Sequence, residues 1–347
     1  NEAVDPELFA AFSDYNGNDD YMYHKTGRWI SDWYTMAMYH DLQRSIRNMP
    51  VLNSENHVIK DGDMQDIPYG HIYAATFEQF LQGVSGMMTW VWREVPPEAA
   101  RKRPDLPGNV YQRPASILAQ STAILDGNRL APEVLAFVNA VPHVGILYSP
   151  TSYIQNPVHY VRALKQLYPA LATTGHKIGF RTETQVLNGD FGTIKLLMLP
   201  GCTHLPPKVV EQLEAFRKQG GKIVVFGDAP QFDQYGKKLA AMFGADAVSG
   251  DLPPAELSRK VGAMADAVEK LPLAMTTAPG ENTGVICRIV QDGDSYLLNI
   301  VNYETAPRRV TLSGAKGKLT DLVAAQPSAF EFDLKPLELR FLRFIPE

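Results

Sequence analysis

Hydrophobic and polar residues follow three patterns along the chain, and each is typical of a different arrangement of strands and helices. Between about residues 142 and 250, short apolar runs alternate with amphipathic stretches. This pattern predicts strands at 144–149, 177–182, 194–199 and 222–226, and helices at 158–172 and 207–218. Strands that alternate with helices form a parallel sheet covered on both faces. The middle of the chain is therefore predicted to be a parallel α/β domain.

From about residue 280 onward, strand patterns follow one another without intervening helices. They predict strands at 284–291, 295–302, 308–312, 329–334 and 337–344. Asp292, Gly293 and Asp294 separate the first two and form a hairpin turn signal. This part is predicted to be a small antiparallel β-sandwich.

The first 115 residues are rich in Trp, Tyr, Met and His. Their pattern predicts strands at 22–25, 49–57 and 87–92, and helices at 28–47 and 74–82. In the longer helix, an apolar stripe recurs at every fourth position: Ile30, Tyr34, Met38, Leu42 and Ile46. Polar or aromatic groups follow the carboxyl end of each strand. In a (β/α)8 barrel that end is the catalytic face.

Composition narrows the classes of function. A length of 347 residues with 45% hydrophobic content predicts two or three domains, and a net charge of −5 argues against binding to nucleic acid. No stretch reaches the roughly 20 apolar residues of a membrane helix. The two cysteines, Cys202 and Cys287, fit neither a disulfide framework nor a thiolate metal site, and no metal or other cofactor is predicted. The compartment stays open.

Glu55 is the leading catalytic candidate from its pattern alone. It ends an apolar strand, and the period of two places Asn53 and His57 on its face, where they could orient an ionised nucleophile. The alternative is a carboxylate in an ordinary solvated loop. Tyr23 and His24 follow the preceding candidate strand, and either a site role or a structural one fits them. Trp90 and Trp92 alternate, so only one of them can face the barrel axis, while the other packs against helices.

Residues 49–57 and 86–92 resemble the seventh and eighth strands of the retaining glycoside hydrolase barrels that use two glutamates. The order of domains is similar to that of the family 42 β-galactosidases. The resemblance implies the C-terminal part of a (β/α)8 barrel at 1–115, a flavodoxin-like trimerisation domain at 116–275 and a β domain at 276–347. It also implies Glu55 as nucleophile, with Asn53, His57, Tyr23, His24, Trp90 and Trp92 around a β-galactoside-like substrate, and a homotrimer.

The sequence departs from this family in one respect. A complete barrel needs roughly 200 to 250 residues, and the predicted first domain has only 115. Glu2 follows Asn1 as the clan's acid/base glutamate follows an asparagine, but Tyr23 comes too soon after it for the intervening elements. We therefore expect the other half of the barrel to precede this chain or to come from a companion chain.

Two other functions remain open at this point. A degenerate barrel remnant could persist as an assembly or carbohydrate-binding module. Cys202 ends a predicted strand in a fold related to amidotransferases and could be a nucleophile, although Leu205, Pro206 and Pro207 follow it where those enzymes begin a helix.

Overall fold

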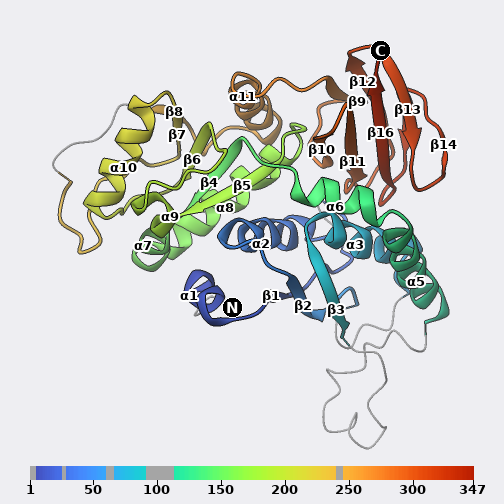
Figure 1. Ribbon diagram of the computed structural model, residues 1–347, viewed down its shortest axis with the longest axis horizontal. Helices are drawn as coiled ribbons and strands as arrows, with labels where there is room; N and C mark the ends of the chain where they lie inside the picture. The colour runs from blue at the N-terminus through green and yellow to red at the C-terminus, as the bar shows by residue number, and fades with distance from the viewer. Residues whose placement is uncertain (1–4, 26–28, 60–65, 91–112, 240–244) are drawn as a thin grey trace, which may run out of the picture.

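The computed structural model describes residues 5–25, 29–59, 66–90, 113–239 and 245–347. The chain forms a three-stranded sheet, a five-stranded sheet and a β-sandwich of two further sheets. The first sheet lies near the N-terminus, the second beside it, and the sandwich at the C-terminal end (Figure 1). Helices lie between these three units. The predicted order of a barrel portion, a parallel α/β domain and an antiparallel β domain is confirmed.

The first unit is a parallel sheet with strand order β1-β2-β3. Its elements are α1 (Pro6–Phe12), β1 (Asn16–Asp20), α2 (Trp33–Ile46), β2 (Val51–Asn56), α3 (Tyr69–Leu81) and β3 (Val84–Thr89). The strand predicted at 22–25 is wrong, because the strand of this unit ends at Asp20 and His24 forms only an isolated bridge with Ser31. The sequence of β1, Asn-Gly-Asn-Asp-Asp, contains the residue types that strands disfavour, so propensity did not indicate it.

Two further helices pack on this unit. They are α5 (Pro114–Arg129) and α6 (Ala131–Asn139). The Tyr73 hydroxyl of α3 donates a hydrogen bond to Asp126 of α5 over 2.9 Å, and Gly127 leaves room for the ring of Phe80. The predicted boundary at 115/116 therefore falls inside α5, a helix that packs on α3 and extends the helical layer of the first unit.

The second unit is a parallel sheet with strand order β5-β4-β6-β7-β8. As in flavodoxin, the second strand along the chain, β5, forms the edge of the sheet, and the first strand, β4, lies between it and the third, β6. Its strands are β4 (Val144–Tyr148), β5 (Ile178–Thr182), β6 (Leu196–Pro200), β7 (Lys222–Phe226) and β8 (Asp246–Val248). Its helices are α7 (Pro150–Gln155), α8 (Pro157–Ala172), α9 (Glu183–Leu187), α10 (Pro207–Lys218) and α11 (Pro254–Asp266). The four strands and two helices predicted here are confirmed to within two residues, because apolar runs and N-terminal prolines mark them locally.

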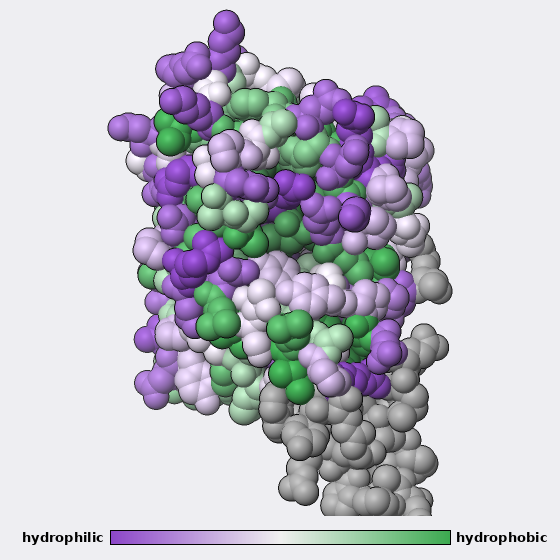
Figure 2. All heavy atoms as spheres, turned by 90° about the vertical axis from the view of Figure 1, so that its right-hand side faces the viewer, coloured by the Kyte–Doolittle hydropathy of each residue, from purple (hydrophilic) through white to green (hydrophobic). Residues whose placement is uncertain are grey.

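The third unit consists of two antiparallel sheets with strand orders β10-β11-β16-β13-β14 and β15-β12-β9. Its strands are β9 (Leu273–Ala278), β10 (Val285–Asp292), β11 (Ser295–Asn302), β12 (Arg308–Gly314), β13 (Gly317–Asp321), β14 (Gln326–Pro327), β15 (Glu331–Leu334) and β16 (Leu339–Pro346). The predicted hairpin is confirmed, since Asp292 pairs with Ser295 and Gly293 has a φ of 59°. Apolar residues on the surface that includes this unit lie in separate groups among polar ones (Figure 2).

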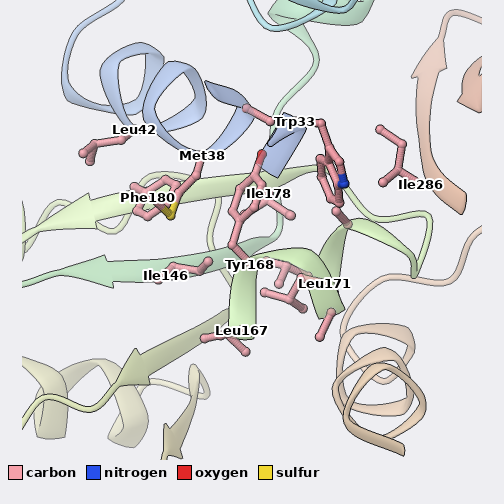
Figure 3. Packing of buried hydrophobic residues seen from close by; sticks show 14 of the residues in the cluster. Trp33, Met38, Leu42, Ile146, Leu167, Tyr168, Leu171, Ile178, Phe180 and Ile286 are labelled. Atoms are coloured by element: carbon pink, nitrogen blue, oxygen red, sulfur yellow. The ribbon is translucent and has the colours of Figure 1, made fainter. Parts of the chain in front are cut away.

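One hydrophobic core joins the three units. Trp33, Met38 and Leu42 of α2 face Phe180 and Ile178 of β5 (Figure 3). The ring of Trp33 also stacks on Tyr303 of the third unit, with centroids 5.3 Å apart. Of the stripe predicted for this helix, Met38 and Leu42 are buried against the second unit, Tyr34 and Ile46 are partly buried, and Ile30 lies before α2 begins. This packing fixes the position of the first sheet.

A buried ion pair reinforces the same junction. Nη1 and Nη2 of Arg288 in β10 donate to Asp41 of α2, over 3.1 and 2.6 Å, and the Tyr168 hydroxyl of α8 donates to Asp41 over 2.6 Å. Asp41 is 5% exposed. One carboxylate of the first unit thus binds side chains of the other two units, and its loss would leave a buried arginine without its partner.

Candidate active site

The candidate site lies at the carboxyl edge of the three-stranded sheet, because the ends of parallel strands meet at one edge. Tyr21 and Tyr23 follow β1, Glu55 and His57 lie at the end of β2, and Trp90 follows β3 directly. The backbone N–H of His57 donates to the carbonyl of Asp20 over 2.8 Å, so the ends of β1 and β2 stay side by side. Trp92 and Glu2 lie outside the described residues.

A β-bulge in β2 separates Asn53 from Glu55. The register of β2 shifts between Asn53 and Asn56 against both neighbouring strands. Asn53 is fully buried, and its amide nitrogen donates to Asn56 over 3.1 Å and to Gln79 of α3 over 2.8 Å. The prediction that Asn53 shares a face with Glu55 is therefore wrong, because a bulge interrupts the period of two. Asn53 reaches Glu55 only through its Oδ1, which accepts the Glu55 backbone N–H over 3.1 Å.

The carboxylate of Glu55 is anchored through one oxygen. Its Oε2 lies 3.2 Å from the Tyr21 hydroxyl, which donates to it, and 3.3 Å from Nε2 of His57. Within the described part of the chain, no donor contacts Oε1, and the side chain is 31% exposed. The arrangement fixes the orientation of the carboxylate and leaves one oxygen open to a reactant.

His57 lies at the centre of an aromatic cluster. Its ring stacks on Trp90 with centroids 5.3 Å apart and lies 4.7 Å from the ring of Tyr21. Nδ1 of His57 lies 3.4 Å from the Tyr23 hydroxyl. The structure thus brings together four of the predicted residues, Glu55, His57, Tyr23 and Trp90. Trp90 reaches the site through contact with His57.

His24 belongs to a different cluster. Its ring lies edge-on to that of His71, 5.4 Å between centroids. His71 is fully buried on α3 and bonds the carbonyl of Met22 through Nε2 over 2.8 Å, and burial lowers its pKa to about 4. His71 is therefore a neutral core histidine. Within the described residues His24 contacts His71 and not Glu55, and its role in substrate binding stays a prediction.

Tyr21 is the site residue that the sequence reasoning missed. It was overlooked because the strand was predicted at 22–25, which placed Tyr21 before the strand rather than after its end. The signal was nonetheless present, since Tyr21 and Tyr23 alternate directly after an Asp pair. A strand ending at Asp20 would have placed Tyr21 first at the carboxyl edge.

The corresponding edge of the second unit is closed. Cys202 follows β6, is fully buried, and burial raises the pKa of its thiol well above the usual range. Its Sγ contacts the carbonyl of Pro200 over 3.6 Å. A reactive cysteine needs thiolate character and access, and Cys202 has neither. The geometry therefore argues against the amidotransferase-type function.

The described residues hold neither a metal-binding cluster nor a membrane-spanning helix. They contain no group of three His, Cys, Asp or Glu side chains placed to hold a metal ion. Among the helices in the same ranges, none is long and apolar enough to cross a membrane.

Comparison with known proteins identifies the fold. No protein-family model and no curated protein sequence matches this chain. Solved structures do match, and they show that the chain has a GH42-like glycoside hydrolase fold. An exo-carrageenase of family GH42 from Bacteroides ovatus aligns with 99% of this chain at a TM-score of 0.83 and 19% identity.

Two β-galactosidases are similar as well. Gan42B, a GH42 β-galactosidase from G. stearothermophilus, aligns with 99% of the chain at a TM-score of 0.73 and 15% identity. A β-galactosidase from Bacillus circulans sp. alkalophilus aligns with 98% at a TM-score of 0.74 and 12% identity. The chain spans 50% of the exo-carrageenase and 61 to 62% of these two enzymes.

Proposed function

We propose that this chain forms part of a retaining glycoside hydrolase that cleaves β-galactoside-like substrates, with Glu55 as the nucleophile. One observation carries the proposal: at the edge where three parallel strands end, Glu55 holds Oε2 against two donors and keeps Oε1 open. Nucleophilic attack by a carboxylate requires this combination of fixed orientation and access. The GH42-like fold supports the same class of reaction.

The chemistry follows from the geometry of Glu55. Oε1 would attack the anomeric carbon and form a glycosyl ester, while the bond from that carbon to the leaving oxygen breaks. A second carboxyl group, about 5 to 5.5 Å from Glu55 in retaining enzymes, would protonate the leaving oxygen and then activate the water that releases the sugar. We place this second group outside the described residues, where Glu2 is a weak candidate. No cofactor is needed for these steps.

The neighbours guide the choice of substrates and of assembly. Two of them are described as β-galactosidases and one as an exo-carrageenase, so aryl β-galactosides and carrageenan oligosaccharides are the first compounds to test. We further propose that the complete barrel includes a segment beyond the described residues or a companion chain, and that the protein self-associates as a trimer. Light scattering and intact mass measure both properties.

Trapping the intermediate tests the role of Glu55. The intact gene product is incubated with a 2-deoxy-2-fluoro aryl β-galactoside, which forms a slowly hydrolysed glycosyl ester on a nucleophilic carboxylate. We expect one adduct, located by peptide mass spectrometry on Glu55, and none in a Glu55→Gln variant. Glu214→Gln is the matched control, since Glu214 lies on α10, away from the first sheet, and its side chain is 24% exposed and paired with Arg217.

Two results would contradict the proposal. Labelling of a different carboxylate would remove Glu55 from its role. Failure of a panel of fluorinated aryl glycosides to label the protein, together with retained binding of sugars, would instead support the non-catalytic carbohydrate-binding alternative.

A further inference from the structure

His57 is held on several sides by groups from three strand ends. Glu55 of β2 faces its Nε2, Tyr23 after β1 faces its Nδ1, and the rings of Tyr21 and Trp90 lie against it. His57 is 3% exposed. Within the described residues, these neighbours supply one carboxylate, that of Glu55, and two tyrosine hydroxyls. The imidazole therefore has little freedom to rotate, and each ring nitrogen faces a defined oxygen.

The two oxygens impose different requirements on the imidazole. A carboxylate accepts hydrogen bonds and cannot donate one, so Nε2 must carry a proton to bind Glu55. A tyrosine hydroxyl can donate, so it can satisfy an unprotonated Nδ1. Neutral His57 fulfils both requirements only when its single proton is on Nε2. With the proton on Nδ1, a lone pair would face the carboxylate of Glu55.

We propose that Tyr23 and His57 form a positioning relay for Glu55, in which Tyr23 donates to Nδ1 and so keeps the proton of His57 on Nε2, toward Oε2. This proposal rests on the proposed function of Glu55. The Tyr23 hydroxyl faces His57 and acts on Glu55 through it, whereas Tyr21 donates to Oε2 directly. In the same way, when a histidine binds a metal through one ring nitrogen, the group that is hydrogen-bonded to its other ring nitrogen fixes the tautomer.

One substitution separates the relay from a direct action of Tyr23. His57→Gln removes the imidazole and its tautomers, while the glutamine amide can still donate to Oε2. In this variant Tyr23 therefore has no ring proton to direct toward Glu55.

A double-mutant cycle tests the relay. The rate of Glu55 labelling by the fluorinated aryl galactoside is measured for the intact gene product, for Tyr23→Phe, for His57→Gln and for the double variant. We expect Tyr23→Phe to slow labelling on the order of ten- to a hundredfold in the wild-type background. This is the effect of losing one hydrogen bond to a charged group, here the bond from Nε2 of His57 to the Glu55 carboxylate. In the His57→Gln background it should have no further effect, because no tautomer remains to be fixed.

Controls separate this proposal from the proposed function. Tyr235→Phe, on an exposed tyrosine of the second unit, should label at the wild-type rate. Circular dichroism checks that each variant is folded, and His57→Asn replaces His57→Gln if that variant is not. Equal slowing by Tyr23→Phe in both backgrounds would overturn the relay and leave Glu55 as nucleophile. Labelling away from Glu55 would overturn the proposed function itself.

Discussion

Two glutamates lie at the carboxyl edges of the two parallel sheets, yet their surroundings differ. Glu183 follows β5 in the second unit, and its two oxygens accept hydrogen bonds from the hydroxyls of Ser149 and Thr151. It is 8% exposed, and burial raises its pKa. Glu55 instead has one oxygen bound and the other uncontacted within the described residues. The comparison teaches that position at a strand end is not sufficient for function, because neighbours can use all of a carboxylate's acceptor capacity.

The largest effect should separate these two carboxylates directly. Glu55→Gln should lower kcat on aryl β-galactosides on the order of a thousandfold or more, because an amide cannot form the glycosyl ester. Glu183→Gln should retain kcat to within about twofold, since its oxygens bind Ser149 and Thr151 and lie in another unit. Steady-state kinetics of the two variants measures both. A comparable fall in kcat for Glu183→Gln would contradict the claim that the two carboxylates differ in function.

The next effect concerns the junction that holds the two sheets in one arrangement. Arg288→Ala should lower the free energy of unfolding by about 3 to 5 kcal/mol, because it leaves Asp41 buried without its guanidinium partner. Arg309→Ala is the matched control, since the pair of Arg309 with Glu331 is exposed and should contribute about 1 kcal/mol or less. Urea unfolding measures both. Equal destabilisation by the two variants would contradict the assigned role of Asp41.

A pH-dependent effect of intermediate size is expected from Glu78 on α3. It is 2% exposed and accepts from Asn299, and burial raises its pKa to about 7 from an ordinary value of 4.5. The stability that it contributes is complete below about pH 4.5 and is lost as pH rises through 7. Glu78→Gln should remove a fall in stability on the order of 1 to 3 kcal/mol between pH 5 and pH 8. A pH profile parallel to that of the unmodified protein would contradict this.

The smallest effect is expected at the closed edge. Iodoacetamide should leave Cys202 unmodified in the native protein and glycosidase activity unchanged, because the thiol is fully buried with a raised pKa. Mass spectrometry of the treated protein, with urea-unfolded protein as the positive control, measures this. Rapid native alkylation with loss of activity would reopen the cysteine-nucleophile alternative.

The sequence by itself determined the strands of the second and third units. In the first unit it indicated the end of β2, where Glu55 lies. The strands Val144–Tyr148 and Lys222–Phe226 are short apolar runs, and Gly293 marks a hairpin, so their signals lie within a few consecutive residues. Glu55 was indicated in the same way, by an apolar strand that ends in polar residues. Local patterns of this kind need no knowledge of the partners.

Only the tertiary structure decided how the site is assembled. Strand β1 lacks strand-forming residues and exists because it pairs with β2, which in turn makes Tyr21 the residue that binds Glu55. The bulge that directs Asn53 toward Gln79 arises from pairing with both neighbouring strands. Likewise, Glu183 and Glu55 both lie at or just after the end of a strand, and the sequence pattern does not distinguish them. They differ in the hydrogen bonds that their carboxylate oxygens accept. Pairing and contacts are non-local, so no periodicity along the chain could have predicted them.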